Sequence, residues 1–312
     1  MAHIARRSWH PLALVFALVA LCSARAARGD GLGAQRFAAA RFVPHGVVLD
    51  ATHVYWTEGD GTIWRKAKRG GSKQQLIQRG LFAIALRRSG KWLLFTSRQG
   101  IYRLGLRGGT PQLLVPMRDT VRLALHGQHI YFIRSKARAL YSVRLDAPRA
   151  KPRVVARGRR LSNVAFGPAR LYVADYYGGV VFSVRPDGTG RRTLTRAIRR
   201  PVDIAVHRRF VYICAERAGT VVRVPRRGGR VEVLARHLSN HEVMIVHAGR
   251  VYWRDWKGGA GRAKLWRLEP ATRRLVAVAT GLSSPARYAL DAEHLYVANK
   301  GTNEILRLAQ RP

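Results

Sequence analysis

The sequence predicts an all-β protein, a β-propeller with seven blades of four antiparallel strands each. The first observation is a short apolar segment, usually centred on a tyrosine, that occurs seven times at intervals of 37 to 44 residues. The second is that apolar and polar residues alternate over short stretches, with no helical periodicity after residue 35. A repeat of about forty residues built from short strands is typical of propeller blades. The seven repeats are centred on Tyr55, Leu94, Tyr131, Tyr172, Tyr212, Tyr252 and Tyr296.

The first repeat shows how one blade is built. Short apolar or alternating stretches predict its strands, since this alternation is typical of a half-buried strand. Turns that contain glycine separate the stretches, and glycine tolerates the positive φ that tight turns need. The expected strands of the first repeat are 47–49, 53–57, 62–66 and 74–78. The later repeats show the same order of elements, so each should form one blade.

The last repeat lacks a fourth strand, because only residues 309–312 follow its third apolar stretch. Ahead of the first repeat lies a stretch, 35–43, that belongs to no other predicted strand. We expect this N-terminal stretch to supply the missing strand and to close the last blade. Closure of this kind leaves no open sheet edge between the two ends of the chain.

The N-terminal region has the pattern of an export signal. Arg6 and Arg7 precede an apolar run at 12–21, which is too short to span a bilayer. Ala24 and Ala26 then supply the small residues of a cleavage site. No later stretch is apolar over the length that a transmembrane helix needs, so we expect no transmembrane segment and an exported protein, either periplasmic, extracellular or at the cell surface. The expected division is a signal peptide at 1–26, a short linker at 27–34 and one propeller domain at 35–312.

The chain is strongly basic, with 57 Lys and Arg residues against 17 Asp and Glu residues and a net charge of +40. The basic residues are spread over every repeat. Two explanations stay open, namely an anionic partner or a general bias toward arginine at solvated positions. The expected partner is an anionic polymer, a cell-surface component or another protein. Specific nucleic-acid binding is disfavoured, because the chain has an export signal and no clustered recognition element.

Two kinds of segment resemble known propeller repeats. Residues 54–58 (VYWTE), followed by 61–65 (GTIWR), resemble the YWTD repeat of lipoprotein-receptor propellers, with Glu58 in place of its aspartate. Residues 171–175 (LYVAD) are similar to NHL-type repeats and to bacterial propellers of the virginiamycin B lyase and gluconolactonase kind. YWTD and TolB-like propellers have six blades and lyase-type propellers have seven. The seven repeats favour seven blades, with a six-bladed TolB-like ring as the alternative.

Candidate ligand-binding residues lie nine positions before the central tyrosines, where the innermost strand of each blade begins. Polar or charged side chains at this position should converge on the mouth of the central channel. Aromatic residues in turns between second and third strands could stack on sugars or rings, since packing does not require them there. The candidate ligand-binding residues are Arg122, Asn163, Asp203 and Arg287 at the channel and Tyr176 and Trp256 in the turns.

Two alternatives involve other chemistry. Asn163, Asp203 and Glu242 carry oxygen donors suited to a divalent cation such as calcium, and the resemblance to gluconolactonases implies a metal near the channel. His241 and Glu242 form a histidine–acid pair, and the resemblance to virginiamycin B lyase implies proton abstraction by such a pair. The competing interpretation is that these side chains end strands and contact water, in which case neither a cofactor nor a catalytic residue is expected.

The sequence favours a binding module over an enzyme. No phosphate-binding loop, dinucleotide fingerprint, HExxH motif or nucleophile elbow occurs in it. We therefore expect an exported propeller that binds an anionic or carbohydrate-like ligand or a protein partner. The alternative is a lyase or lactonase-type propeller enzyme, with or without a metal ion.

Overall fold

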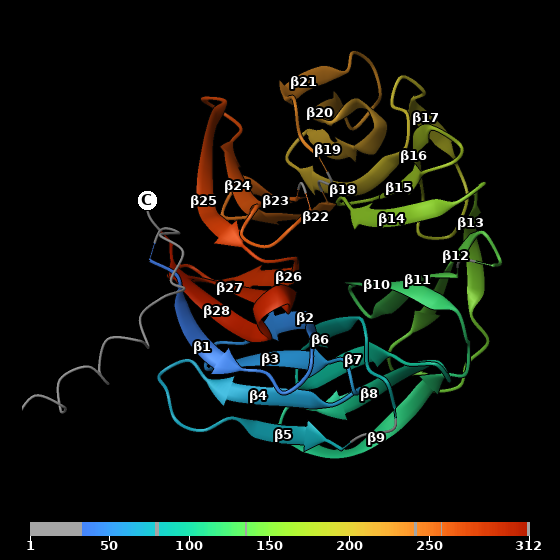
Figure 1. Cartoon of the computed structure of the whole chain (residues 1–312). Coiled ribbons are helices and arrows are strands. Elements are labelled where there is room, and N and C mark those ends of the chain that lie inside the picture. Colours follow the sequence, from blue (N-terminus) through green and yellow to red (C-terminus); the bar gives the residue numbers. More distant parts are fainter. Residues whose placement is uncertain (1–32, 79–80, 135, 240–241, 257, 311–312) are drawn as a thin grey trace, which may run out of the picture.

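The chain forms seven four-stranded antiparallel sheets arranged in a ring (Figure 1). The prediction of seven blades is confirmed, and the six-bladed alternative is wrong. The computed structural model describes residues 33–310 except 79–80, 135, 240–241 and 257. The expected signal peptide at 1–26 lies outside the described residues, as does most of the expected linker at 27–34. Among the described residues, no helix is long and apolar enough to cross a membrane.

Blades one to three each take four consecutive strands from the chain, and the first of these lies nearest the centre of the ring (Figure 1). Blade one contains β2 (Pro44–Leu49), β3 (His53–Glu58), β4 (Ile63–Ala67) and β5 (Gln74–Ile77). Blade two contains β6 (Leu86–Ser89), β7 (Trp92–Thr96), β8 (Ile101–Gly105) and β9 (Gly108–Val115). Blade three contains β10 (Thr120–His126), β11 (His129–Arg134), β12 (Ala139–Arg144) and β13 (Arg153–Arg157).

Blades four to six repeat this order, and one short 3₁₀ helix, η1 (Glu216–Ala218), follows a second strand. Blade four contains β14 (Leu161–Phe166), β15 (Leu171–Asp175), β16 (Val180–Val184) and β17 (Arg192–Thr195). Blade five contains β18 (Pro201–His207), β19 (Phe210–Ala215), β20 (Thr220–Pro225) and β21 (Glu232–Ala235). Blade six contains β22 (Glu242–His247), β23 (Arg250–Trp256), β24 (Ala263–Glu269) and β25 (Arg274–Leu282).

Blade seven is built from both ends of the described chain. It contains β26 (Pro285–Leu290), β27 (His294–Asn299), β28 (Glu304–Ala309) and, as its fourth strand, β1 (Gln35–Ala39), with η2 (Lys300–Thr302) after β27. β1 pairs antiparallel with β28, from Gln35 opposite Arg307 to Ala39 opposite Glu304. The predicted closure by the N-terminal stretch is therefore confirmed.

The hydrophobic core consists of seven clusters, one between each pair of neighbouring blades. The repeated tyrosines are part of this arrangement. Tyr296, for example, is buried and packs edge-to-face against Phe37 of β1, with ring centroids 5.2 Å apart. Lys68 of blade one adds an ion pair across the closure, with Nζ 2.7 Å from Oδ2 of Asp291 in blade seven. No blade can bury its faces alone, so the closed ring is the stable unit.

The ring has two distinct faces. On one, which we call the loop face, second strands connect to third strands and each blade connects to the next. On the other, which we call the hairpin face, first strands turn into second strands and third strands into fourth. A carboxylate or amide at the end of a second strand accepts backbone N–H groups of a loop-face segment in four of the seven blades. These residues are Glu58, Asp175, Asp255 and Asn299.

Candidate functional site

The innermost strands carry the predicted channel residues in a common geometry. In blades three, four and five the register shifts by one residue just before Arg122, Asn163 and Asp203. An extra residue of this kind bends a strand and redirects the side chains beside it. These three residues consequently occupy equivalent places around the axis of the ring.

A cavity of about 420 Å³ lies along the innermost strands of six blades, and we call it the channel cavity. Its wall contains parts of β2, β6, β14, β18, β22 and β26, from their early residues to the ends at Leu49, His247 and Leu290. It therefore follows the axis of the ring toward the hairpin face. Its polar and charged lining residues are Arg87, Arg88, Asn163, Asp203, His247, Arg287 and Tyr288. Of the predicted ligand-binding residues, Asn163, Asp203 and Arg287 meet here.

Asp203 is the carboxylate of this cavity, and its side chain ties three blades together. This residue is only 1% exposed. Oδ1 accepts the backbone N–H of Ile204 at 2.8 Å and a hydrogen bond from the amide of Asn163 in blade four. Oδ2 accepts the backbone N–H of Met244 in blade six at 3.0 Å. Both oxygens are thus occupied by N–H donors, which satisfies a buried charge.

Three arginines from three blades lie in or beside the channel cavity. Arg87 and Arg287 line the cavity with Asp203. Arg122 lies close by, where its Nε donates to the carbonyl oxygen of Ser162 at 3.1 Å. Burial and the positive charge of Arg122 lower the pKa of Arg87, and the charge of Asp203 only partly offsets this. The like charges raise the electrostatic potential at the centre of the ring.

Arg87 and Tyr288 are site residues that the sequence did not single out. Arg87 lies opposite Leu94 in the sheet, where the equivalent residues of the other blades are small or apolar, as at Val48 and Ala165. A comparison of the residues seven before each central position would have found it. The buried Tyr288 hydroxyl donates to the carbonyl oxygen of Val243 at 2.5 Å. Burial, reinforced by the charge of Asp203, raises its pKa well above the usual range, so it stays protonated.

The structure does not bring Tyr176 into the channel cavity. Tyr176 lies in the loop-face turn after β15, where its ring packs edge-to-face on Tyr177 with centroids 5.1 Å apart. The guanidinium of Arg160 lies 4.9 Å from the ring centre of Tyr176 and 5.0 Å from that of Tyr177. A hydrogen bond to Glu216, together with burial, raises the pKa of Tyr176. This group forms a separate aromatic and cationic rim.

Trp256 also lies away from the channel cavity. It is the last residue of β23, where its Nε1 donates to the carbonyl oxygen of Gly259 at 3.3 Å. Its ring packs against the core cluster between blades six and seven. The packing and the hydrogen bond give this tryptophan a structural environment, and its binding role stays a prediction.

The residues of the catalytic alternative are only partly within the described chain. His241 lies outside the described residues, and of Glu242 only the backbone is described, as the first residue of β22 opposite Arg254. Where side chains are described, no three His, Cys, Asp or Glu residues come together in a way that could hold a metal ion. Oδ1 of Asn163 faces the backbone N–H of Val164 at 2.8 Å. A cation between Asn163 and Asp203 would have to displace these N–H contacts, and the metal site stays a prediction.

Comparison with known proteins shows the fold. No protein-family model and no curated protein sequence matches the chain. Among solved structures, it is similar to a catalytically inactive histidine variant of virginiamycin B lyase from Staphylococcus aureus with quinupristin, at 15% identity and a TM-score of 0.72 over 90% of this chain and 99% of that chain. The chain is a β-propeller repeat protein. The WD40 propeller of Doa1 (14% identity, TM-score 0.70, 90% and 98% covered) and U3-55K (11%, 0.72, 89% and 98%) are similar to it as well. Identities this low carry the fold and no function.

Proposed function

We propose that this protein is an exported propeller that binds a small anionic, sugar-like ligand in its channel cavity. The observation that carries the proposal is that Arg87, Arg122 and Arg287, from three different blades, lie in or beside a cavity whose described wall contains one carboxylate, that of Asp203. Guanidinium groups form strong, directional hydrogen bonds with carboxylates and phosphates. An anion would also relieve the mutual repulsion of these arginines.

The size and wall of the channel cavity support a small ligand. Its volume of about 420 Å³ lies within the range of small-molecule sites. Apolar side chains such as Val48 and Ile245 form much of the wall beside the arginines. A mixed wall of this kind suits a ring with one anionic group, such as a sugar acid or a sugar phosphate.

Calorimetric titration of the purified protein with glucuronate and with glucose 6-phosphate tests the proposal, with glucose as the neutral comparison. We expect binding of at least one of the two anions, weakening as salt rises, and no binding of glucose. Arg287→Ala and Arg87→Ala should each weaken the binding about tenfold or more, because each removes one charge-assisted hydrogen-bonding group. Failure of both anions to bind would overturn the proposal.

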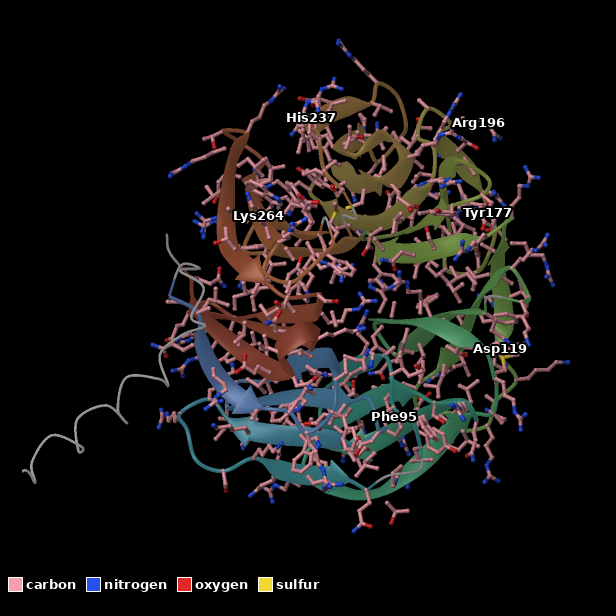
Figure 2. All side chains as sticks on the ribbon, in the orientation of Figure 1. Phe95, Asp119, Tyr177, Arg196, His237 and Lys264 are labelled. Atoms are coloured by element: carbon pink, nitrogen blue, oxygen red, sulfur yellow. The ribbon has the colours of Figure 1, made fainter. Side chains whose placement is uncertain are left out.

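Arg196→Ala is the matched control for these substitutions. Arg196 is exposed and lies at the outer edge of the ring (Figure 2), so its removal changes the net charge equally without touching the channel cavity. Its effect on anion affinity should be less than twofold. An equal loss in Arg196→Ala and Arg287→Ala would mean that overall charge, and not the cavity, holds the anion.

The second candidate function is a lyase that uses His241 and Glu242. The similarity to a virginiamycin B lyase over nearly the whole of both chains supports it. Glu242 begins β22, two residues before Met244, whose N–H binds Asp203, so the pair of His241 and Glu242 adjoins the channel region in sequence. Incubation with quinupristin followed by liquid chromatography tests this candidate. A product that forms with the native protein and not with His241→Ala would favour the enzyme over the binding module.

A metal-dependent version of either function also predicts a tightly bound divalent ion. Elemental analysis of the purified protein should then find a divalent ion in stoichiometric amount, and Asp203→Ala should lose it. A protein that contains no such ion after dialysis against calcium would exclude a calcium-dependent site.

A further inference from the structure

The hairpin face of blades four to six contains three neighbouring cavities that share lining residues. One of about 600 Å³ lies between blades four and five, and one of about 640 Å³ lies between blades five and six. A third, of about 710 Å³, continues along the outer edge of blades five and six. Arg209 lines the first two cavities, and Phe210 and Arg223 line the last two. We call the combined surface the arginine groove.

The arginine groove is strongly basic. Its three cavities are lined by eleven different arginines and only two acidic residues, Glu232 and Glu269. The cavity between blades four and five is lined by five arginines and by no acidic residue. There, burial and the neighbouring charge of Arg192 lower the pKa of Arg170, while Nε of Arg226 is buried without a hydrogen-bond partner among the described residues. This cavity therefore concentrates positive charge with no carboxylate in its own wall to neutralise it.

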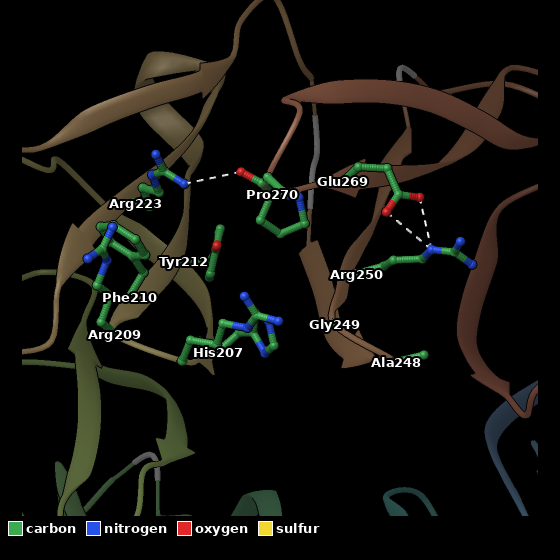
Figure 3. Close-up of a pocket in the computed structure, with 12 residues that line it drawn as sticks. His207, Arg209, Phe210, Tyr212, Arg223, Ala248, Gly249, Arg250, Glu269 and Pro270 are labelled. Atoms are coloured by element: carbon green, nitrogen blue, oxygen red, sulfur yellow. Dashed lines mark hydrogen bonds and ion pairs between the residues drawn. The ribbon is translucent and has the colours of Figure 1, made fainter.

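The two carboxylates of the groove are each shared between two arginines. Glu232 accepts from Nε of Arg223 at 2.7 Å and pairs with Arg273 as well. Glu269 pairs with Nε of Arg250 at 2.9 Å and with Nε of Arg267 at 3.2 Å. Figure 3 shows the ion pair of Arg250 and Glu269 across the cavity from Arg223, which reaches the carbonyl oxygen of Pro270. These pairs position the side walls, and the exposed Arg208, Arg209 and Arg227 remain at the surface.

The aromatic side chains of the groove do not offer a free face for stacking. The guanidinium groups of Arg223 and Arg209 lie 4.3 Å and 5.3 Å from the ring centre of Phe210. Tyr172 and Tyr212 are buried. Proteins that bind single-stranded nucleic acids combine a positive groove with exposed aromatic faces, and duplex readers insert a protruding helix or strand pair. Neither feature is present among the described residues of this surface.

We infer that the arginine groove binds a linear acidic polysaccharide, whose sulfate or carboxylate groups contact the arginines of successive blades. A linear polymer matches the shape, because the three cavities continue from blade four to blade six. Because arginines cover the ring of Phe210, the groove would recognise its ligand through charge and not through stacking. The site lies on the face opposite the loops and is independent of the small anion proposed for the channel cavity.

The test uses a heparin decasaccharide as the probe, titrated against the full protein over a series of salt concentrations. The groove variant is R208Q/R209Q/R227Q, which removes three exposed charges. The matched control is R69Q/R107Q/R149Q, which removes three exposed charges from third-to-fourth-strand hairpins of blades one to three on the same face. We expect at least a tenfold loss of affinity in the groove variant and less than threefold in the control. The slope of log affinity against log salt should become shallower by up to about three in the groove variant, which is about one for each arginine that no longer neutralises an anionic group of the polymer.

Other results of these titrations would support or overturn the proposed polysaccharide binding. Retention of most of the affinity in R208K/R209K/R227K would support it, because charge is kept while the guanidinium geometry changes. Equal losses in the groove and control variants, or no loss in either, would overturn it in favour of diffuse charge. Equally tight binding of a poly(dT) oligonucleotide of matched charge, lost in the same variant, would overturn the assignment to polysaccharide. The groove variant should still bind the channel anion, so failure here leaves the proposed function intact.

Discussion

Asp175 and Asp203 are carboxylates buried to the same degree, yet they serve different parts of the molecule. Asp175 is 2% exposed and Asp203 is 1% exposed. The bonds of Asp175 stay within its own blade, to the backbone N–H groups of Arg159, Arg160 and Gly178. The bonds of Asp203 reach the blades on both sides, through Asn163 and Met244.

The two positions also differ in how often they recur around the ring. The position of Asp175 holds an acid or amide in four of the seven blades, and the bonds to the loop recur with it. The position of Asp203 holds a different kind of residue in most blades, including Arg122 and Val243. A residue that the repeats share supports the fold, whereas a residue found in one blade is available for a site. Arg87, which replaces a small or apolar residue, belongs to the second kind.

The largest effect should come from the repeated position. Asp175→Ala removes the acceptor of three backbone N–H groups and leaves them partly buried, so the free energy of unfolding should fall by about 3–5 kcal/mol. Urea denaturation followed by circular dichroism measures this. The affinity for the channel anion should not change at a temperature where the variant is folded. A loss below about 1 kcal/mol would contradict the structural role of this position.

Asp203→Asn should separate stability from binding. The amide keeps the shape but has one acceptor oxygen in place of two, so the N–H groups on one side of Asp203 lose their acceptor and the free energy of unfolding should fall by about 1–3 kcal/mol. Removing the negative charge leaves Arg87, Arg122 and Arg287 unopposed by this carboxylate, so the affinity for glucuronate should rise by about five- to tenfold. Calorimetry measures the change, with Asp175→Asn as the control. A lower affinity would instead mean that Asp203 contacts the ligand or a cation directly.

The fold could be predicted because the repeated residues determine it. Seven apolar segments at similar intervals required seven equivalent burial environments, and a last repeat without its fourth strand required a donor strand. The stretch 35–43 supplies the closing strand as predicted, but β1 ends at Ala39, and the N–H of Ala40 still bonds to Asn303, just ahead of β28. The backbone N–H groups of Arg41 and Phe42 bond to Glu58 instead.

The site could be predicted only where the spacing between the strands is regular. Counting back from the tyrosines located Asn163, Asp203 and Arg287, because their hairpins have matching lengths. In blade two, β6 begins at Leu86 and pairs with β7 without a register shift, so the same count gave no clear residue and Arg87 was missed. The turn residues Tyr176 and Trp256 are placed by contacts with other segments, which a spacing rule cannot reveal.

Asp50 in blade one and Asp291 in blade seven occupy the same turn of the repeat, and they also differ in whether their bonds reach a neighbouring blade. Each accepts two backbone N–H groups just ahead of its second strand, but only Asp291 also accepts from Lys68 of the neighbouring blade. Burial alone would raise the pKa of Asp291, but the hydrogen bonds from Lys68 and the backbone outweigh it and lower the pKa. A lowered folded-state pKa stabilises the protein above the unfolded value of about 4, and this contribution is lost as pH falls further.

Lys68→Met should therefore make the protein less stable near neutral pH by about 1 kcal/mol and should flatten the loss of stability below about pH 4. Urea denaturation at a series of pH values measures both changes. Arg69→Met, at an exposed neighbour in the same turn, is the control and should leave the profile unchanged. A profile for Lys68→Met identical to that of the native protein would show that the ion pair across the closure contributes nothing.

The smallest effect should come from the rim, at the residue after Asp175. Tyr176 is unique among the repeats at this position, where the other blades include Gly59, Trp256 and Lys300, but it lies outside the channel cavity. Tyr176→Phe keeps the ring that packs on Tyr177 and removes the hydroxyl that bonds to Glu216, so affinity for the channel anion should change by less than twofold. Tyr176→Ala should change it by no more than about threefold, because the ring lies outside the channel cavity. Calorimetry with glucuronate measures both, and a loss as large as that of Arg287→Ala would place the ligand at the rim and not in the channel.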